Sequence, residues 1–212
     1  MTSRVLIVDD HPLLRQGVRQ LMEMEPDLEA VGEASNGEEG LRLADELDPD
    51  MILLDLGMRG MGGVETLQAL RQKGIRAQVV VLTVSENDED ITASLRAGAN
   101  GYLLKDMEPE ALVTQLRRAA AGEVVISDSL TASLARALTR DRPQQDLELS
   151  QLTVREREIL RHLARGQSNK IIGRSLGITE GTTKVHVKNL LKKLGFRSRV
   201  EAAVWAVEKG FQ

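Results

Sequence analysis

Five polar residues follow four short apolar runs in the first half of the sequence, and together they could hold a divalent cation and a phosphoryl group. The runs 5–8 and 51–54 end in carboxylates, and the runs 79–82 and 101–104 end in a hydroxyl and an ammonium. These polar residues are Asp9, Asp10, Asp55, Thr83 and Lys105. In an open parallel α/β sheet, the carboxyl ends of the strands form the ligand crevice. We therefore expect the five side chains to converge at one edge of a sheet.

The residue types indicate phosphoryl transfer to a carboxylate. Two carboxylates about 4 Å apart repel each other by about 4 kcal/mol at an effective dielectric near 20, and a hard cation removes this cost. Mg²⁺ binds oxygen ligands, typically one or two carboxylates together with water and phosphate oxygens. Asp55 would then be the nucleophile that accepts a phosphoryl group and forms an acyl phosphate. The Lys105 ammonium and the Thr83 hydroxyl would stabilise the phosphoryl oxygens.

Each of these residues taken alone has a simpler interpretation. A single aspartate after a strand is usually a solvated turn former, and a lone lysine is usually solvated. Only the joint pattern at four strand ends favours a phosphoacceptor site. His11 could assist the neighbouring acids, but a solvated loop histidine is the more typical case. A phosphohydrolase is disfavoured, because Gly57 stands where such enzymes usually carry a second carboxylate.

The elements that must position these residues alternate between strand and helix through about 120 residues. Asn36 can cap one helix, and Pro109 can open another. Five such strand–helix units predict a parallel sheet with helices on both faces, and the nearly continuous apolar strands fit burial on both faces. Residues 123–147 differ: 127–138 could form a short helix, and the polar stretch 140–146 is typical of a tether.

Charge is divided unevenly along the chain. Residues 1–122 carry a net charge of −10, residues 123–147 carry −1 and residues 148–212 carry +7. An acidic part joined to a basic part predicts two domains with different partners, and the basic part is the candidate for nucleic-acid binding. The chain has no cysteine, and its apolar runs are far shorter than the ~20 residues that span a bilayer. We expect a cytoplasmic protein without membrane contact.

The last part of the chain, residues 148–212, carries only helical signals. Thr153 and Glu156 have the spacing of a capping box, and Ser168 and Thr179 can cap the next two helices. A fourth helix follows. Two helices joined by a short glycine-containing turn are typical of a helix-turn-helix, so we expect a small all-α domain of four helices.

The third of these helices, 181–194, divides into an apolar face and a basic face. The apolar face, at core spacing, contains Thr183, Val187, Leu190, Leu191 and Leu194. The opposite face contains Lys184, Lys188 and Lys192, with Val185 and Asn189 beside them. A valine among lysines fits the major groove, where it can contact a thymine methyl group while lysine reads guanine. The flanking residues that could contact phosphates are Thr182, His186 and Lys193. A merely solvated lysine stripe is the alternative.

The polar residues at the four strand ends make residues 3–122 resemble the receiver domain of two-component response regulators. The resemblance implies a flavodoxin-like α/β fold with five parallel strands in the order 2-1-3-4-5. It implies phosphorylation of Asp55 and Mg²⁺ bound by Asp9, Asp10, Asp55 and the Gly57 carbonyl. It also implies a switch formed by Thr83, Tyr102 and Lys105, although Tyr102 could serve packing alone. The family often has proline at the position of Arg59.

Residues 148–210 resemble the LuxR-type helix-turn-helix of the NarL/FixJ family, in the segments 152–160, 166–170 and 182–187. The resemblance implies that Lys184, Val185 and Lys188 read bases and that the last helix supports dimerisation. Over essentially the whole length, the chain resembles the nitrate- and nitrite-responsive members of this family, but no residue shows that signal. Two departures are Gly173, where the family usually has alanine, and Gly181 in the first turn of the basic helix.

Together these features predict a phosphorylation-controlled transcription regulator rather than an enzyme. A sensor histidine kinase would phosphorylate Asp55, and the released helical domains would form a homodimer on double-stranded promoter DNA. RNA polymerase is a further partner that this prediction allows. We expect the acidic receiver to cover the basic recognition helix before phosphorylation. The alternative is a phosphorylation-independent regulator with a vestigial receiver, which the complete set of reacting groups disfavours.

Overall fold

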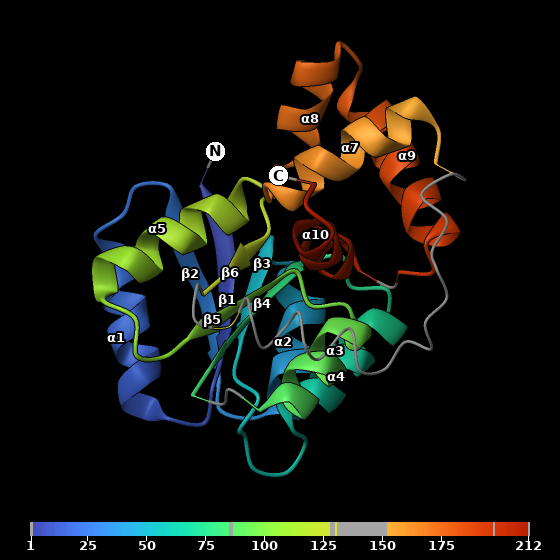
Figure 1. Cartoon of the computed structure of the whole chain (residues 1–212). Coiled ribbons are helices and arrows are strands. Elements are labelled where there is room, and N and C mark those ends of the chain that lie inside the picture. Colours follow the sequence, from blue (N-terminus) through green and yellow to red (C-terminus); the bar gives the residue numbers. More distant parts are fainter. Residues whose placement is uncertain (1, 85–86, 128–129, 131–151, 197, 212) are drawn as a thin grey trace.

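An α/β domain and a smaller helical domain make up the protein (Figure 1). The computed structural model describes residues 2–84, 87–127, 130, 152–196 and 198–211. One parallel sheet forms the centre of the first domain, with strands in the order β2-β1-β3-β4-β5-β6. Its strands are β1 (Ser3–Val8), β2 (Leu28–Ala34), β3 (Met51–Leu54), β4 (Gln78–Thr83), β5 (Gly101–Leu104) and β6 (Val125–Ile126). The predicted order of the first five strands is confirmed.

Helices cover both faces of this sheet, as the strand pattern predicted. They are α1 (Pro12–Glu23), α2 (Gly37–Leu47), α3 (Gly63–Gln72), α4 (Asp88–Ala97) and α5 (Pro109–Ala120). Helices α1 and α5 lie on one face, and α2, α3 and α4 lie on the other (Figure 1). Each face has its own apolar cluster, built from alternate strand residues such as Leu6 on one side and Ile7 on the other. Asn36 caps α2 as predicted, because its side chain accepts a hydrogen bond from the Glu39 N–H.

The sheet has one strand more than predicted. The short strand β6 pairs in parallel with β5. Beyond it, the Ser127 N–H donates to the Tyr102 carbonyl at 3.0 Å, and the Leu104 N–H donates to Ser127 Oγ at 3.1 Å. These bonds satisfy backbone groups along the outer edge of β5. A two-residue strand is too short to show a periodic pattern. The predicted linker helix and tether lie almost entirely outside the described residues.

The described part of the second domain contains four helices, as predicted. They are α7 (Val154–Ala164), α8 (Asn169–Leu176), α9 (Glu180–Lys193) and α10 (Arg199–Glu208). Side chains of Thr153, Ser168, Thr179 and Ser198 cap these helices by accepting a hydrogen bond from a first-turn N–H. Their apolar faces enclose a separate core around Leu160, Leu190 and Trp205. None of the helices described in the chain is long and apolar enough to cross a membrane.

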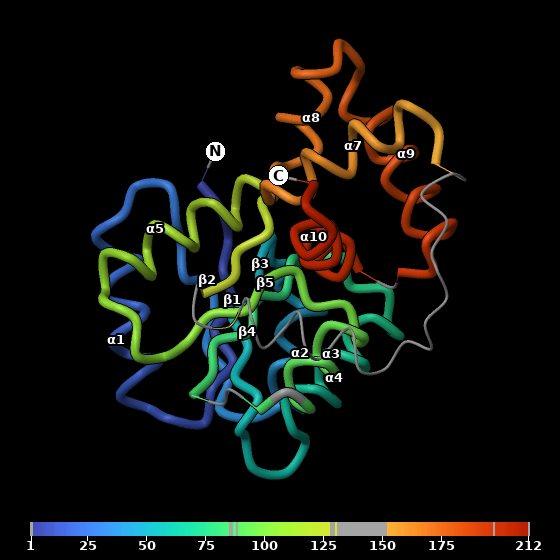
Figure 2. Tube along the Cα trace, viewed as in Figure 1, coloured from blue at the N-terminus to red at the C-terminus, as the bar shows by residue number. Residues whose placement is uncertain are grey.

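The helical domain contacts the α/β domain at the amino ends of the strands. In Figure 2, α10 lies at that end of the sheet, while the loop that follows β3 lies at the other end. The Val124 N–H, just before β6, donates to the Gly166 carbonyl between α7 and α8 at 2.9 Å. Val200 and Val204 of α10 are buried in an apolar cluster with side chains of the sheet. The two domains therefore share both a backbone hydrogen bond and apolar packing.

Candidate functional site

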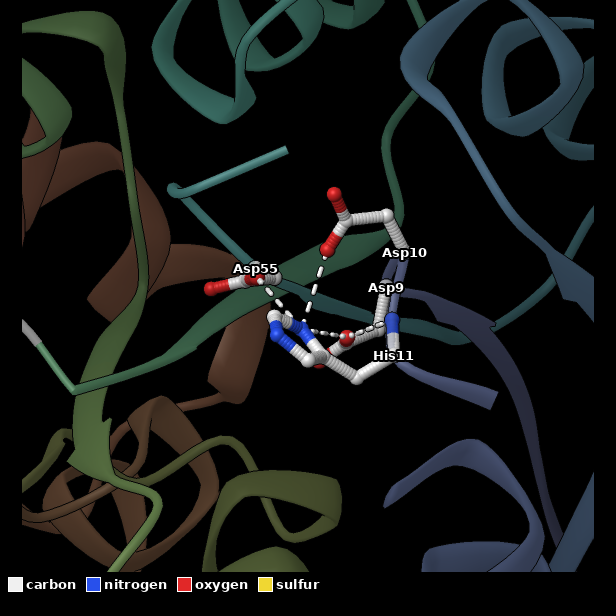
Figure 3. Close-up of side chains that lie close together, drawn as sticks. All are labelled: Asp9, Asp10, His11 and Asp55. Carbon is white, nitrogen blue, oxygen red and sulfur yellow. Dashed lines mark hydrogen bonds and ion pairs between the residues drawn. The ribbon is translucent and has the colours of Figure 1, made fainter. Parts of the chain in front are cut away.

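Three aspartates and a histidine meet at the carboxyl ends of β1 and β3 (Figure 3). Asp9 and Asp55 are each only 3% exposed, while Asp10 is partly exposed. One ligand atom from each of Asp9, Asp10, His11 and Asp55 lies within 4.8 Å of the others. The parallel pairing of β1 with β3 causes this convergence, since Val8 and Leu54 are register partners at the ends of the two strands. The structure thus brings the predicted acids together.

Lys105 neutralises part of this acidic cluster. Its Nζ lies 2.8 Å from Asp9 Oδ2 and 2.8 Å from Asp55 Oδ2, and its side chain is 8% exposed. The lysine reaches this position because β5 and β4 are paired up to Thr83, whose carbonyl accepts a hydrogen bond from the Lys105 N–H. Thr83 itself is buried at the end of β4. A desolvated lysine between two carboxylates can stabilise the negative charge of a phosphoryl group bound to either carboxylate.

The cluster has an oxygen that fits a metal ligand. Asp10 Oδ1 is buried, and it accepts no hydrogen bond although His11 Nδ1 lies 2.9 Å away. A buried carboxylate oxygen whose one close contact is a histidine, beside two further carboxylates, is a suitable donor for a hard cation. The backbone of Gly57 passes close by, since a Cβ at this residue would lie 3.8 Å from Asp55 Oδ2. Hence the donor set present here fits a divalent cation with oxygen ligands.

Two further residues, His11 and Arg59, contact the acids. His11 is 68% exposed, yet its Nδ1 lies 3.2 Å from Asp9 Oδ1 as well as beside Asp10. The Arg59 N–H donates to Asp10 Oδ2 at 3.3 Å, a bond that a proline at this position could not make. The departure at Arg59 therefore supplies a backbone donor to one of the acids. The sequence Asp-Asp-His was the only signal for the histidine.

Tyr102 is fully buried on the same strand that carries Lys105 at its end. Its ring belongs to the apolar cluster on the α4 side of the sheet, together with Ile91 and Leu95. Burial, with smaller contributions from Asp90 and Asp55, raises the pKa of the Tyr102 hydroxyl well above its ordinary value of 10. The hydroxyl is therefore neutral at physiological pH, and in this conformation the ring serves packing.

Helix α9 presents the predicted basic face to solvent. Thr183, Val187 and Leu190 are buried against the domain core, as predicted. The exposed residues on the opposite side are Thr182, Lys184, Val185, Lys188, Asn189 and Lys192. Val185 is 58% exposed, and His186 is half-buried. Lys193 differs from the prediction, because its Nζ pairs with Glu156 Oε2 at 2.8 Å and stabilises the start of α7.

The expected covering of the recognition helix by the receiver is wrong for this conformation. The receiver packs against α10 and the turn before α8, and the basic face of α9 stays open to solvent. The physical reason is the apolar surface of α10, on which all residues from Val200 to Ala206 are buried. A helix that is apolar on every side must be covered on every side, and the small helical domain covers only one of them. Apolar packing, rather than attraction between the acidic and basic parts, places the domains.

The fold and the site together define a DNA-binding response regulator. Residues 5–117 match the response regulator receiver domain, and residues 150–206 match the luxR family of bacterial regulatory proteins. The chain belongs to the LuxR-type two-component response regulators, and it is a transcription regulator with a receiver domain and a helix-turn-helix domain.

Relatives and solved structures with the same architecture extend over nearly the whole chain. The nitrate/nitrite response regulator protein NarL of Escherichia coli K12 is 56% identical over 96% of this chain and 94% of its own length. A nitrate/nitrite response regulator homolog of Haemophilus influenzae is 46% identical over 97% of both chains. The crystal structure of the response regulator ChrA, from a heme-sensing two-component system, is 31% identical, with a TM-score of 0.54 over 100% of this chain and 99% of ChrA. The RcsB–DNA complex, at 23% identity over 98% of both chains and a TM-score of 0.59, shares the fold.

Proposed function

We propose that a sensor histidine kinase phosphorylates Asp55. The observation that carries this proposal is the contact between Asp55 Oδ2 and Lys105 Nζ at 2.8 Å, inside a cluster of three carboxylates. A carboxylate oxygen of Asp55 would attack the phosphorus of the kinase phosphohistidine, and the phosphorus–nitrogen bond would break as the imidazole leaves. Lys105 and Thr83 would then hold the phosphoryl oxygens.

We infer that Asp9, Asp10, Asp55 and the Gly57 carbonyl hold Mg²⁺ during this transfer. When bound, the ion supplies positive charge to the acids and to the incoming phosphoryl group. Asp10 contributes its buried Oδ1, and Lys105 supports Asp9 on the opposite side. His11 lies over the same acids and would have to leave the position that it occupies beside Asp10.

The output of the phosphorylated receiver would be dimeric binding to promoter DNA in the cytoplasm. Thr83 and Tyr102 would shift toward the phosphoryl group, and the movement of β5 would reach the helical domain through β6 and the Val124–Gly166 bond. Release would expose Val200 and Val204 on α10, which we propose as the surface that joins two copies. The major-groove contacts would come from Thr182, Lys184, Val185, His186, Lys188, Asn189 and Lys192. Nitrate-responsive promoters are the targets that the similarity to nitrate/nitrite response regulators suggests.

Intact-mass measurement tests the phosphoacceptor directly. The full chain is incubated with Mg²⁺ and a small phosphodonor, together with the variants Asp55→Asn and Asp106→Asn. Asp106 is an exposed aspartate just after Lys105 and serves as the matched control. We expect a single phosphoryl gain in the wild type and in Asp106→Asn, and none in Asp55→Asn. Absence of a gain in the wild type would leave a phosphorylation-independent DNA-binding regulator as the better account.

A further inference from the structure

The contact between the domains covers one functional surface of the helical domain and leaves the other open. Val200 and Val204, on the proposed pairing surface of α10, are buried in a cluster with side chains of the sheet. On α9, by contrast, Lys184, Val185 and Lys188 are exposed to solvent. The docked chain therefore presents its DNA-reading face, while its pairing surface is occupied by the receiver.

The receiver contacts the helical domain away from the turn that joins α8 to α9. The Val124–Gly166 hydrogen bond lies before α8, and Leu191, near the carboxyl end of α9, lines a crevice together with Ala97 and Asn100 of the receiver. The turn itself, at residues 177–179, lies at the end of the helical domain farthest from the sheet (Figure 1). In a helix-turn-helix, the amino-terminal residues of the recognition helix contact base edges. DNA would thus approach from the side away from the receiver.

Helix α8 adds positive charge that docking also leaves accessible. Its side chains Lys170 and Arg174 are exposed and lie one helical turn apart. The first helix of a helix-turn-helix crosses the DNA backbone, where such cations neutralise phosphates. Both parts of the helix-turn-helix that DNA requires are consequently open in the docked chain.

We propose that the docked, unphosphorylated chain binds one DNA half-site as a monomer, and that docking withholds only the second copy. Contact with a half-site needs the exposed faces of α8 and α9, whereas occupation of two half-sites needs the α10 surface that the receiver covers. The inference rests on the proposed pairing through α10. Phosphorylation would then control cooperation between half-sites, and the affinity for a single half-site should be the same before and after it.

A reversible cross-link can hold the docked arrangement, because the chain has no cysteine of its own. A Cβ at Gly166 would lie 3.9 Å from Val124 Cβ, and a Cβ at Gly122 would lie 3.4 Å from Ser168 Cβ. Disulfide-bonded Cβ atoms are about 3.5–4.5 Å apart, so Val124→Cys/Gly166→Cys should oxidise within one chain. This pair brings the Gly166 Cβ to 3.0 Å from the Val124 carbonyl oxygen, so Gly122→Cys/Ser168→Cys replaces it if it does not fold. The Val124→Cys single variant, treated with the same oxidant, is the control.

Fluorescence anisotropy with labelled duplexes tests the proposal. The DNA is a site selected from random sequences by the wild type, together with a version in which one arm is scrambled. At about 0.15 M ionic strength the Debye length is about 8 Å, which limits repulsion from the acidic receiver. We expect the oxidised and reduced forms to bind the single arm within about twofold of each other. After phosphorylation, only the reduced form should bind the two-arm site about tenfold or more tightly than the single arm.

Three results would overturn the proposal. Failure of both cysteine pairs to cross-link would show that the docked arrangement is not populated in solution. Loss of single-arm binding on oxidation, restored by a reductant, would show that the docked receiver obstructs DNA. Equal two-arm binding by the oxidised and reduced phosphorylated forms would show that docking does not withhold the second copy. A phosphorylated wild type that binds two arms no tighter than one would contradict the proposed dimer instead, and the single-arm comparison would still decide whether the docked chain binds DNA.

Discussion

The acidic cluster of the receiver and the basic face of α9 hold their charges in opposite ways. In the cluster, buried Asp9 and Asp55 share one lysine, so each charge depends on its neighbours. On α9, by contrast, Lys184, Lys188 and Lys192 are exposed and make no ion pair within the described part of the chain. Desolvated charges are coupled to folding, whereas solvated charges are available to a partner. A substitution in the first region should therefore change stability, and one in the second should change binding alone.

The substitution Lys105→Gln should have the largest effect on stability. It leaves two buried carboxylates without their shared cation, and breaking such a pair typically costs about 3–5 kcal/mol of unfolding free energy. Urea unfolding without divalent cations measures this loss. In an Asp55→Asn background the loss should be smaller, because one of the two negative charges is gone. An equal loss in both backgrounds would contradict the coupling between Lys105 and Asp55.

Alanine substitutions at two glycines of the helical domain should change the free energy of unfolding in opposite directions. At Gly173 a Cβ would lie 2.8 Å from the Ile178 carbonyl oxygen and 3.1 Å from Thr183 Oγ1, so Gly173→Ala should destabilise by about 1–3 kcal/mol. At Gly181 the nearest atom is Thr179 Oγ1 at 3.8 Å, so Gly181→Ala should stabilise by up to about 1 kcal/mol. Thermal unfolding of both variants checks the pair. Stabilisation by both alanines would show that α8 and α9 pack less closely at Gly173.

The substitution Lys188→Gln should affect DNA binding without affecting folding. The side chain is exposed, so the free energy of unfolding should stay within about 0.5 kcal/mol of the wild type. If Lys188 contacts a phosphate, the slope of log affinity against log salt should fall by about 0.9, and if it reads a base, discrimination should weaken instead. Lys209→Gln, an exposed lysine after α10, is the matched control. A large loss of stability in Lys188→Gln would remove the distinction between the two regions.

The smallest effect concerns acid stability at Glu156. Burial alone would raise the pKa of this carboxyl, but hydrogen bonds from Lys193 and Thr153 outweigh burial and lower the pKa below its ordinary value of 4.5. The lowered folded-state pKa means that the stabilisation is complete above about pH 4.5 and is lost as the pH falls through the folded value. In the variant Glu156→Gln, the free energy of unfolding should therefore fall less steeply as the pH drops below that value. An unchanged profile, measured by urea unfolding at several pH values, would contradict this role.

The acidic site could be predicted because its residues are tied to strand ends. An apolar run of four residues predicts a strand, and the polar residue that follows it, Asp55 or Lys105, must then lie at the carboxyl end of that strand. Parallel pairing then brings the ends together without further information. The caps at Asn36, Thr153 and Ser168 were predictable for a similar reason, because each depends only on residues within one turn.

The domain contact could not be predicted, because it depends on surfaces that are distant in the sequence. Charge separation suggested that the acidic part would cover α9, but Val200 and Val204 decide the packing instead. In the sequence these valines look like part of an ordinary helix core. Strand β6 was missed because two residues give no periodic pattern. For His11 the sequence left contact with the acids and solvent exposure open, because a loop conformation decides between them.

Helix α10 is buried against its own domain on one side and against the receiver on the other, and this implies that the switch has a threshold set by protein abundance. Under the proposed mechanism, Val200 and Val204 contact either their own receiver or a second copy, and never both. The first contact is unimolecular and independent of how much protein the cell contains, whereas the second follows the square of the free concentration. The same degree of phosphorylation would thus produce little DNA-bound dimer in a cell with few copies and much more in a cell with many.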